Sequence, residues 1–219
     1  MKSMKNAILP QSMESKKQIK IDLLSGFRGA GKTRFLREME KNLWRDERVI
    51  LLINEKGNTA IDQSELRDNH FVEYWQGGCI CCTSSLYLMQ RLRELADLYT
   101  PDRIVIEMTE TGLISDLIKI FTEMTDIIAT VEHVIYVVND SAFLKRWNVS
   151  EGFVTKQLME KPLIIFNTFS SGKDFYPAAS LIESEFTRAA SYYCKDFEKQ
   201  PMDFEGLYVR SRRHKKITF

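Results

Sequence analysis

The eight-residue stretch "GFRGAGKT", at positions 26–33, constrains the fold of this 219-residue chain more than any other feature. It matches the phosphate-binding pattern G-x-x-x-x-G-K-[ST], which follows a buried strand and opens a helix. The residues before it, "IKIDLLSG" from Ile19, are apolar enough for such a strand, and apolar residues recur at helical spacing over residues 32–44. The chain is therefore predicted to contain a strand–loop–helix unit that binds a polyphosphate.

Each residue type in this loop has a chemical reason to be there. Glycine allows backbone N–H groups to approach phosphate oxygens, and the positive end of the helix dipole faces the same oxygens. The ammonium of Lys32 can reach the β- and γ-phosphates, and the hydroxyl of Thr33 can ligate Mg²⁺. The predicted nucleotide-binding residues of the loop are Gly26, Gly29, Ala30, Gly31, Lys32 and Thr33.

Strand-like and helix-like segments alternate along the rest of the chain. Short apolar runs rich in branched residues predict buried strands. These runs are "RVILLIN" (48–54), "FVEYW" (71–75), "RIVIE" (103–107), "HVIYVVND" (133–140) and "PLIIFN" (162–167). Helical spacing predicts helices over 85–99 and 113–129. Because such alternation implies parallel strands with right-handed crossovers, we predict an α/β three-layer P-loop NTPase fold with a mainly parallel sheet flanked by helices.

The chain is long enough for one well-buried domain, which we place at residues 19–200. Residues 1–18 are polar and basic and are expected to form a flexible leader. Residues 201–219 are expected to form a basic C-terminal tail. Its run "RSRRHKK" is interpreted as solvated, because it is isolated and lacks interleaved aromatic residues.

Composition narrows the range of partners and compartments. The formal net charge of +1 offers no electrostatic reason to expect nucleic acid or an anionic membrane as partner. The sequence has no run of eighteen apolar residues, so no transmembrane helix is expected. Three of the four cysteines fall within four positions, and a disulfide framework would need partners spread along the chain. The pattern favours a reducing cytoplasm.

The cysteine group "GGCICC", at positions 77–82, is the second chemical feature. Cys79, Cys81 and Cys82 can face one ion if the backbone bends, and the two preceding glycines permit bending. Thiolates suit Zn²⁺ and other late transition metals, and three of them leave a fourth coordination position open. Two alternatives remain at this point: the cysteines pack as small apolar side chains in the core, or they form a redox switch.

Taken in order, the motifs resemble a known family. "GFRGAGKT", "INEKGNTAID" and "GGCICCTSSL" are followed by "RIVIEMTETGL", "VIYVVNDSAF" and "PLIIFN", and together they resemble CobW-type proteins of the CobW/HypB/UreG group of P-loop GTPases over residues 19–170. The resemblance implies GTP binding and hydrolysis linked to a transition metal, in a metallochaperone or cofactor-insertion factor. It implies Mg²⁺, GTP or another NTP, and Zn²⁺, with Co²⁺ or Ni²⁺ as alternatives. It also implies an apo-metalloprotein client and allows a homodimer.

The resemblance also implies roles for particular residues. Glu107 matches an acidic residue that holds Mg²⁺ or orients the attacking water, so Lys32 and Glu107 are the expected catalytic residues. Gly112 matches a glycine whose N–H meets the γ-phosphate. Asp62 and Glu55 match acidic positions of a switch loop, and Asp62 is the expected further Mg²⁺ ligand. This loop would couple the nucleotide to a metal at Cys79, Cys81 and Cys82.

Three departures from the family pattern bear on function. The base-reading motif N-K-x-D is here Asn167-Thr168-Phe169-Ser170, so only the asparagine remains and the preference for guanine is open. The spacing between Glu107 and Gly112 is stretched, which makes Glu110 an alternative acid. The second domain common in CobW-type proteins, with its histidine-rich stretch, has no match in this sequence. The three histidines, His70, His133 and His214, are isolated and are expected at the surface or in packing roles.

The resulting prediction is a metal-linked GTP hydrolase with a low intrinsic rate, because no arginine finger can be assigned from the sequence. Arg28, inside the loop, is only a candidate for that role. One alternative is a nucleotide-binding sensor or partner module that does not hydrolyse. Another is a P-loop small-molecule kinase, which would need an arginine-rich lid over the phosphates.

Overall fold

The computed structural model describes residues 18–54, 61–75, 85–124, 129–160, 162–167, 177–185, 191–194 and 217–218. The strands are β1 (Ile19–Gly26), β2 (Val49–Ile53), β3 (His70–Tyr74), β4 (Arg103–Glu107), β5 (Ala129–Asn139), β6 (Leu163–Asn167), β7 (Ser191–Cys194) and β8 (Ile217–Thr218). The helices are α1 (Lys32–Asn42), α2 (Ser85–Tyr99), α3 (Ile114–Glu123), α4 (Asp140–Met159) and α5 (Pro177–Glu185), with a short 3₁₀ turn η1 (Gln63–Glu65).

The strands form one sheet in the order β3-β2-β4-β1-β5-β6-β7, and each neighbouring pair along this path is parallel. β8 is antiparallel to the start of β5, where Thr218 pairs with Thr130. The central strands are buried along their whole length, because helices cover both faces of the sheet. The predicted α/β fold with a mainly parallel sheet is confirmed.

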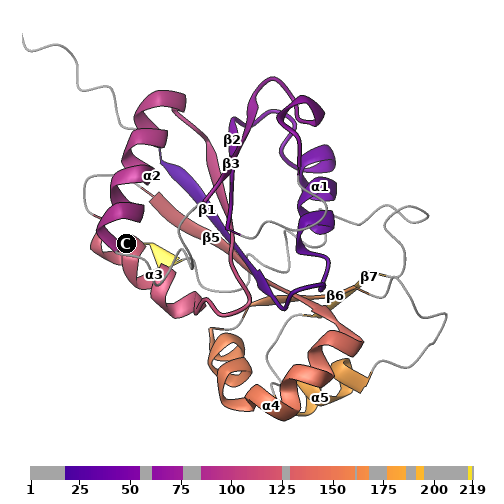
Figure 1. Cartoon of the computed structure of the whole chain (residues 1–219). Helices are drawn as coiled ribbons and strands as arrows, with labels where there is room; N and C mark the ends of the chain where they lie inside the picture. Colours follow the sequence, from indigo (N-terminus) through magenta and orange to yellow (C-terminus); the bar gives the residue numbers. More distant parts are fainter. Residues whose placement is uncertain are drawn as a thin grey trace, which may run out of the picture.

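The core has two halves, one on each face of the sheet. On one face, α1 packs Phe35, Leu36 and Met39 against the sheet. On the other face, apolar side chains of α2, α3, α4 and α5 pack against the alternate residues of the same strands. Figure 1 shows α1 on one side of the sheet and α2 and α3 on the other. Burial of these apolar surfaces drives the three layers together.

Two predicted boundaries are wrong. The helix expected over residues 113–129 ends at Glu123, and Ala129 already belongs to β5, which was expected to begin only at His133. The reason is tertiary: residues 129–131 pair with the first residues of β1, and this pairing overrides the local helical spacing. Among the described helices, none is long and apolar enough to cross a membrane.

Candidate functional site

The candidate site lies where β1, β4 and β6 end, at one edge of the sheet. The strands are parallel, so their carboxyl ends meet there, and Leu24 of β1 pairs with Glu107 of β4. On the other side, Gly26 pairs with Val137 of β5. This edge is where open α/β sheets bind their ligands.

The phosphate-binding loop needs glycine at its two ends. Gly26 has a φ of 139°, and a Cβ there would overlap the backbone of Val137. Gly31 has a φ of 93°, and a Cβ there would overlap the side chain of Asn167. Gly31 is also the N-cap of α1 and provides no capping side chain, so the first N–H groups of α1 open toward the loop.

Lys32 is held over the loop by the loop's own backbone. Its Nζ donates hydrogen bonds to the carbonyl oxygens of Gly26, at 3.0 Å, and Phe27, at 3.3 Å. The side chain is buried, and these carbonyl oxygens offset part of the cost of burying its charge. The structure thus places an ammonium group against the backbone of the loop. The predicted contact of Lys32 with phosphate oxygens stays a prediction.

Thr33 and Glu107 meet directly beneath the loop. Thr33 Oγ1 donates to the Glu107 carboxylate, 3.3 Å from Oε1 and 3.5 Å from Oε2. Glu107 is only 2% exposed, at the end of β4, and Asn54 N–H donates to its carbonyl oxygen at 3.0 Å. A hydroxyl and a carboxylate oxygen side by side are the kind of ligands that Mg²⁺ prefers.

Asp62 is engaged elsewhere in the structure. Its exposed carboxylate caps η1 by accepting hydrogen bonds from Ser64 N, at 2.8 Å, and Ser64 Oγ, at 2.6 Å. These two hydrogen bonds lower the pKa of Asp62. Its neighbour Ile61 is tied through its backbone N–H and carbonyl to the hydroxyl of Tyr74, at 2.6 and 2.9 Å. The predicted role of Asp62 as a Mg²⁺ ligand stays a prediction.

Asn167 and Gly112 border the loop in different ways. Asn167, at the end of β6, is buried and donates from Nδ2 to the Ala30 carbonyl at 2.7 Å. Asn167 therefore supports the phosphate-binding loop, independently of any contact with the base of a nucleotide. Gly112 N–H donates to the Thr109 carbonyl at 3.2 Å, and Gln157 Nε2 of α4 donates to the Gly112 carbonyl at 2.5 Å. Gly112 could offer its N–H to a phosphate only after this turn opens.

Glu110 and Arg146 are brought to the loop from two other segments. The carboxylate of Glu110 accepts a hydrogen bond from Arg28 N at 3.2 Å and pairs with Arg146 Nη2 of α4 at 3.1 Å. Beside this pair lies a hollow of about 280 Å³, lined by Phe27, Glu110, Thr111, Arg146, Ser150 and Phe153. Sequence reasoning missed Arg146, because nothing in its local pattern distinguishes it from other exposed helical arginines.

The cysteine group lies outside the described residues, as do Glu55 and residues 168–170. The flanks of the cysteine group are described. Trp75 N–H donates to the Ile53 carbonyl at 2.8 Å, at the end of β3. The Trp75 ring lies 5.2 Å, centroid to centroid, from the ring of Tyr87 in the first turn of α2. The two ends of the predicted metal-binding segment are therefore anchored close to each other.

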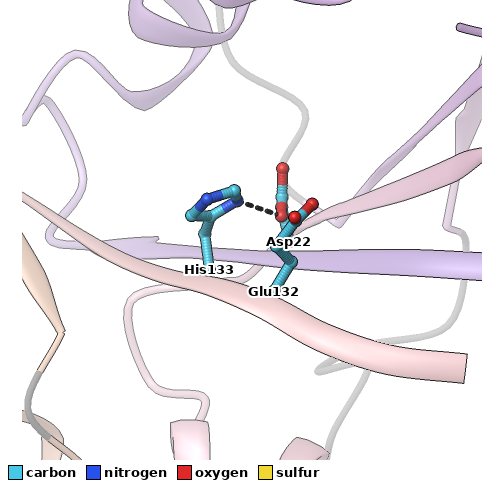
Figure 2. Close-up of side chains that lie close together, drawn as sticks. All are labelled: Asp22, Glu132 and His133. Carbon is cyan, nitrogen blue, oxygen red and sulfur yellow. Dashed lines mark hydrogen bonds and ion pairs between the residues drawn. The ribbon is translucent and has the colours of Figure 1, made fainter. Parts of the chain in front are cut away.

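A second polar cluster lies at the opposite end of the strands, away from the loop. Figure 2 shows Asp22, Glu132 and His133, whose ligand atoms lie within 4.8 Å of one another, close enough for one metal ion. His133 Nδ1 lies 2.7 Å from Asp22 Oδ1. The register shifts between Ile21 and Asp22, so Val131 and His133 are the partners of adjacent β1 residues and Glu132 is an extra residue. Such a bulge lets neighbouring side chains gather on one side of a sheet.

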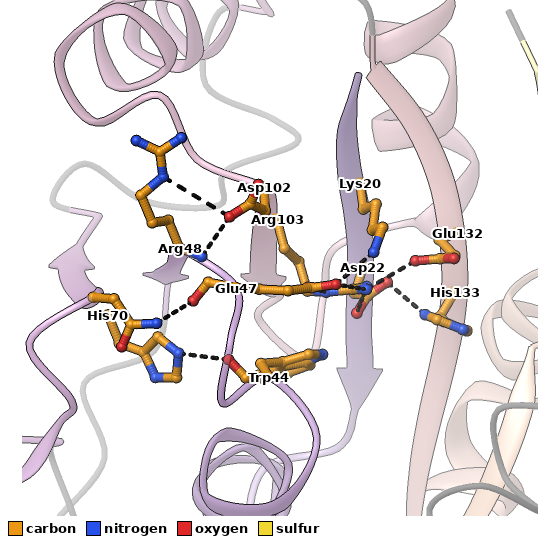
Figure 3. Close-up of polar contacts among 11 residues, drawn as sticks. Lys20, Asp22, Trp44, Glu47, Arg48, His70, Asp102, Arg103, Glu132 and His133 are labelled. Carbon is orange, nitrogen blue, oxygen red and sulfur yellow. Dashed lines mark hydrogen bonds and ion pairs between the residues drawn. The ribbon is translucent and has the colours of Figure 1, made fainter. Parts of the chain in front are cut away.

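A cation already occupies this cluster. The guanidinium of Arg103, fully buried, donates to Asp22 Oδ2 at 2.6 Å, to Glu47 Oε2 at 2.6 Å and to Glu132 Oε2 at 2.9 Å. The same guanidinium lies 5.7 Å from the ring centroid of Trp44. Figure 3 shows the network continuing to Lys20, which pairs with Glu47 at 2.5 Å. We interpret the cluster as a structural ion-pair network that joins β1, β4 and β5.

These features define a class of protein. The chain has a strand–loop–helix unit with its lysine and threonine, a buried acidic residue on the strand beside β1 in the sheet, and a parallel sheet with helices on both faces. Together these features constitute a P-loop NTPase domain. The family model "CobW/HypB/UreG, nucleotide-binding domain" matches residues 20–173, well over half of the chain. The chain belongs to the CobW/HypB/UreG family, whose members are P-loop GTPases.

Known relatives agree with this assignment. The chain is 31% identical over 102 residues to the zinc chaperone YeiR of Escherichia coli (strain K12), a match that covers 46% of this chain and 31% of that protein. It is 32% identical over 136 residues to the zinc chaperone CobW of Sinorhizobium sp, covering 57% of this chain and 38% of that protein. The matched part thus spans about a third of the length of these relatives.

Solved structures support the fold. The Zn(II)-bound YjiA GTPase from E. coli superposes with a TM-score of 0.61 and 20% identity, over 89% of this chain and 62% of that chain. The hydrogenase maturation factor HypB from Archaeoglobus fulgidus superposes with a TM-score of 0.57 and 16% identity, over 88% and 87% of the two chains.

Proposed function

We propose that this chain is a GTP-binding and GTP-hydrolysing domain whose turnover is linked to a transition metal, with Zn²⁺ as the first candidate. The observation that carries the proposal is the meeting of Thr33 and Glu107 beneath the loop that holds Lys32. The family assignment supports GTP, and the relatives named as zinc chaperones support the metal.

The reaction is hydrolysis of the β–γ phosphoanhydride. Water attacks the γ-phosphorus, the bond to the bridging oxygen breaks, and the diphosphate leaves. Thr33 and Glu107 fit Mg²⁺ as oxygen ligands, and this ion would neutralise charge on the phosphates. Lys32 shifts its hydrogen bonds from the loop carbonyls to phosphate oxygens. Glu107 either holds the ion, directly or through water, or orients the attacking water. The backbone N–H groups of the loop and of α1 bind the polyphosphate.

The link to the metal would run through the end of β3. Tyr74 anchors Ile61, near the end of the predicted switch loop, and Trp75 leads into the segment that carries Cys79, Cys81 and Cys82. Tyr74 and Glu107 are the register partners of one residue, Ile53 of β2, one on each side. A change in the switch loop on hydrolysis would therefore reach the cysteines through adjoining residues. A client apo-metalloprotein would receive the ion, and the domain could act as a homodimer.

The decisive experiment measures phosphate release from GTP with Mg²⁺, in the presence and absence of Zn²⁺. It compares the wild type with Glu107→Gln and with a Cys79/Cys81/Cys82→Ser triple variant. We expect Zn²⁺ to change the rate in the wild type and not in the triple variant, and Glu107→Gln to release little phosphate with or without Zn²⁺. Nucleotide binding without release under any condition would instead favour the sensor, and release that needs an added small acceptor would favour the kinase.

A further inference from the structure

Glu110 connects three segments that are distant in the sequence. Its carboxylate accepts a hydrogen bond from the backbone N–H of Arg28 in the phosphate-binding loop, at 3.2 Å. It also accepts hydrogen bonds from Arg146 Nη2 of α4, at 3.1 Å to Oε1 and 3.3 Å to Oε2. Glu110 belongs to the stretched spacing between Glu107 and Gly112.

A carboxylate on this loop competes with a phosphate. The backbone N–H groups of such a loop recognise phosphate oxygens, and here one of them, at Arg28, already donates to an anion. In the proposed binding mode a triphosphate adds one further phosphate group, whose negative charge would lie at the loop that the Glu110 carboxylate contacts. The Glu110 side chain is only 27% exposed. Because water screens charges poorly in a partly buried site, the carboxylate and the added phosphate would repel each other.

The structure provides space for the carboxylate to move. Glu110 and Arg146 both line the hollow of about 280 Å³ beside the loop. α4 is not continuous along this hollow: Ser150, another lining residue, has non-helical dihedral angles of φ −140° and ψ 35°.

We propose that Glu110 and Arg146 form a sensor of the terminal phosphate, a specificity-determining pair that distinguishes triphosphate from diphosphate. With a diphosphate, Glu110 remains on Arg28 N–H and on Arg146. A triphosphate displaces the carboxylate into the hollow, and the Arg146 guanidinium exchanges its carboxylate partner for a phosphate oxygen. The inference rests on the proposed nucleotide binding, and it assigns discrimination to a pair outside the loop motif.

The test is isothermal titration of GDP and of the non-hydrolysable analogue GppNHp, with Mg²⁺ present, on the full chain. Glu110→Gln keeps the shape and an accepting oxygen but removes the charge, so it should tighten GppNHp about tenfold and leave GDP within about twofold. Arg146→Gln should weaken GppNHp about tenfold with little change for GDP. The matched control is Lys145→Gln, which removes a charge from the adjacent exposed position of α4 and should change neither affinity.

The outcomes separate the two proposals. If wild-type protein binds both nucleotides and Glu110→Gln leaves their affinity ratio unchanged, the sensing pair is overturned while nucleotide binding stands. If the wild type binds neither nucleotide, both proposals are overturned. If Arg146→Gln weakens both nucleotides equally, Arg146 supports the loop and does not sense the phosphate. Thermal unfolding of each variant establishes that it remains folded.

Discussion

Thr33 Oγ1 lies 3.3 Å from Glu107 Oε1, although 74 residues separate them in the chain. The contact arises from the order of the strands. β4 lies next to β1, so the residue that ends β4 comes to rest beside the first turn of the helix that follows β1. An α/β sheet with parallel strands places the two side-chain oxygens together although they are distant in the sequence.

Thr33→Val should selectively abolish the effect of Mg²⁺ on triphosphate binding. The variant keeps the shape of the side chain and loses the hydroxyl, so we expect GppNHp to bind roughly tenfold or more weakly with Mg²⁺. In EDTA the variant and the wild type should bind GppNHp equally. Titration calorimetry under the two conditions measures this. Thr122→Val, on the exposed side of α3, is the matched control, and an Mg²⁺ effect retained in Thr33→Val would contradict the assignment.

Asn167→Ala should weaken the binding of phosphate chains that carry no base. Asn167 Nδ2 donates to the Ala30 carbonyl, so the residue holds the loop. Losing one buried hydrogen bond of about 0.5–1.5 kcal/mol corresponds to roughly 2- to 12-fold in affinity. We expect this loss for inorganic tripolyphosphate as well as for GTP and ATP, measured by competition with a fluorescent nucleotide. A loss confined to GTP would mean that Asn167 acts only on the base.

Much of the fold could be predicted because buried parallel strands are continuous apolar runs. "RVILLIN", "RIVIE" and "PLIIFN" match β2, β4 and β6 to within a residue at each end. The start of β5 could not be predicted, because residues 129–131 become a strand only through pairing with β1. Local spacing contains no information about that partner.

The same distinction applies to the site. The motif itself located Lys32 and Thr33, and the family resemblance located Glu107, which the structure places against Thr33. Arg146 could not be found, since its role depends on a contact across 36 residues. His133 was expected in a surface or packing role, and it is buried beside Asp22. Strict alternation would have put Glu132 and His133 on opposite faces of the sheet, and the bulge prevents this.

Arg103→Met should destabilise the fold by roughly 3–5 kcal/mol at neutral pH, because it leaves Asp22, Glu47 and Glu132 without their shared cation in a buried place. The free energy of unfolding in urea measures the loss. Arg91→Met is the matched control. Arg91 pairs with Glu73 and Glu94 at the surface, so its loss should cost less than about 1 kcal/mol. Equal effects of the two substitutions would contradict the structural role of Arg103.

The pH dependence of stability should follow the same network. Burial is the largest influence on Asp22 and opposes its ionisation, but the charges of His133 and Arg103 and their hydrogen bonds outweigh it, so the pKa of Asp22 lies below its usual value. A carboxyl with a lowered folded-state pKa contributes stability above its ordinary pKa, and loses it as pH falls through the folded-state pKa. Wild-type stability should therefore decline below about pH 4, and the deficit of Arg103→Met should shrink there. A deficit that stays constant between pH 7 and pH 3 would argue against this linkage.

Trp75 should report on metal binding by the cysteine segment. Its ring lies 5.2 Å from Tyr87, centroid to centroid, and these two residues stand on either side of Cys79, Cys81 and Cys82. An ion held by three thiolates would change the relative positions of Trp75 and Tyr87, and this change would alter the fluorescence emission of Trp75.

Zn²⁺ titration should therefore alter tryptophan fluorescence in the wild type and in Trp147→Phe, a control that removes a tryptophan of α4. The change should disappear in Trp75→Phe and in the triple serine variant. A response that persists in the triple serine variant would place the ion elsewhere in the protein. Asp22, Glu132 and His133, whose ligand atoms lie close together, would then be the next residues to replace.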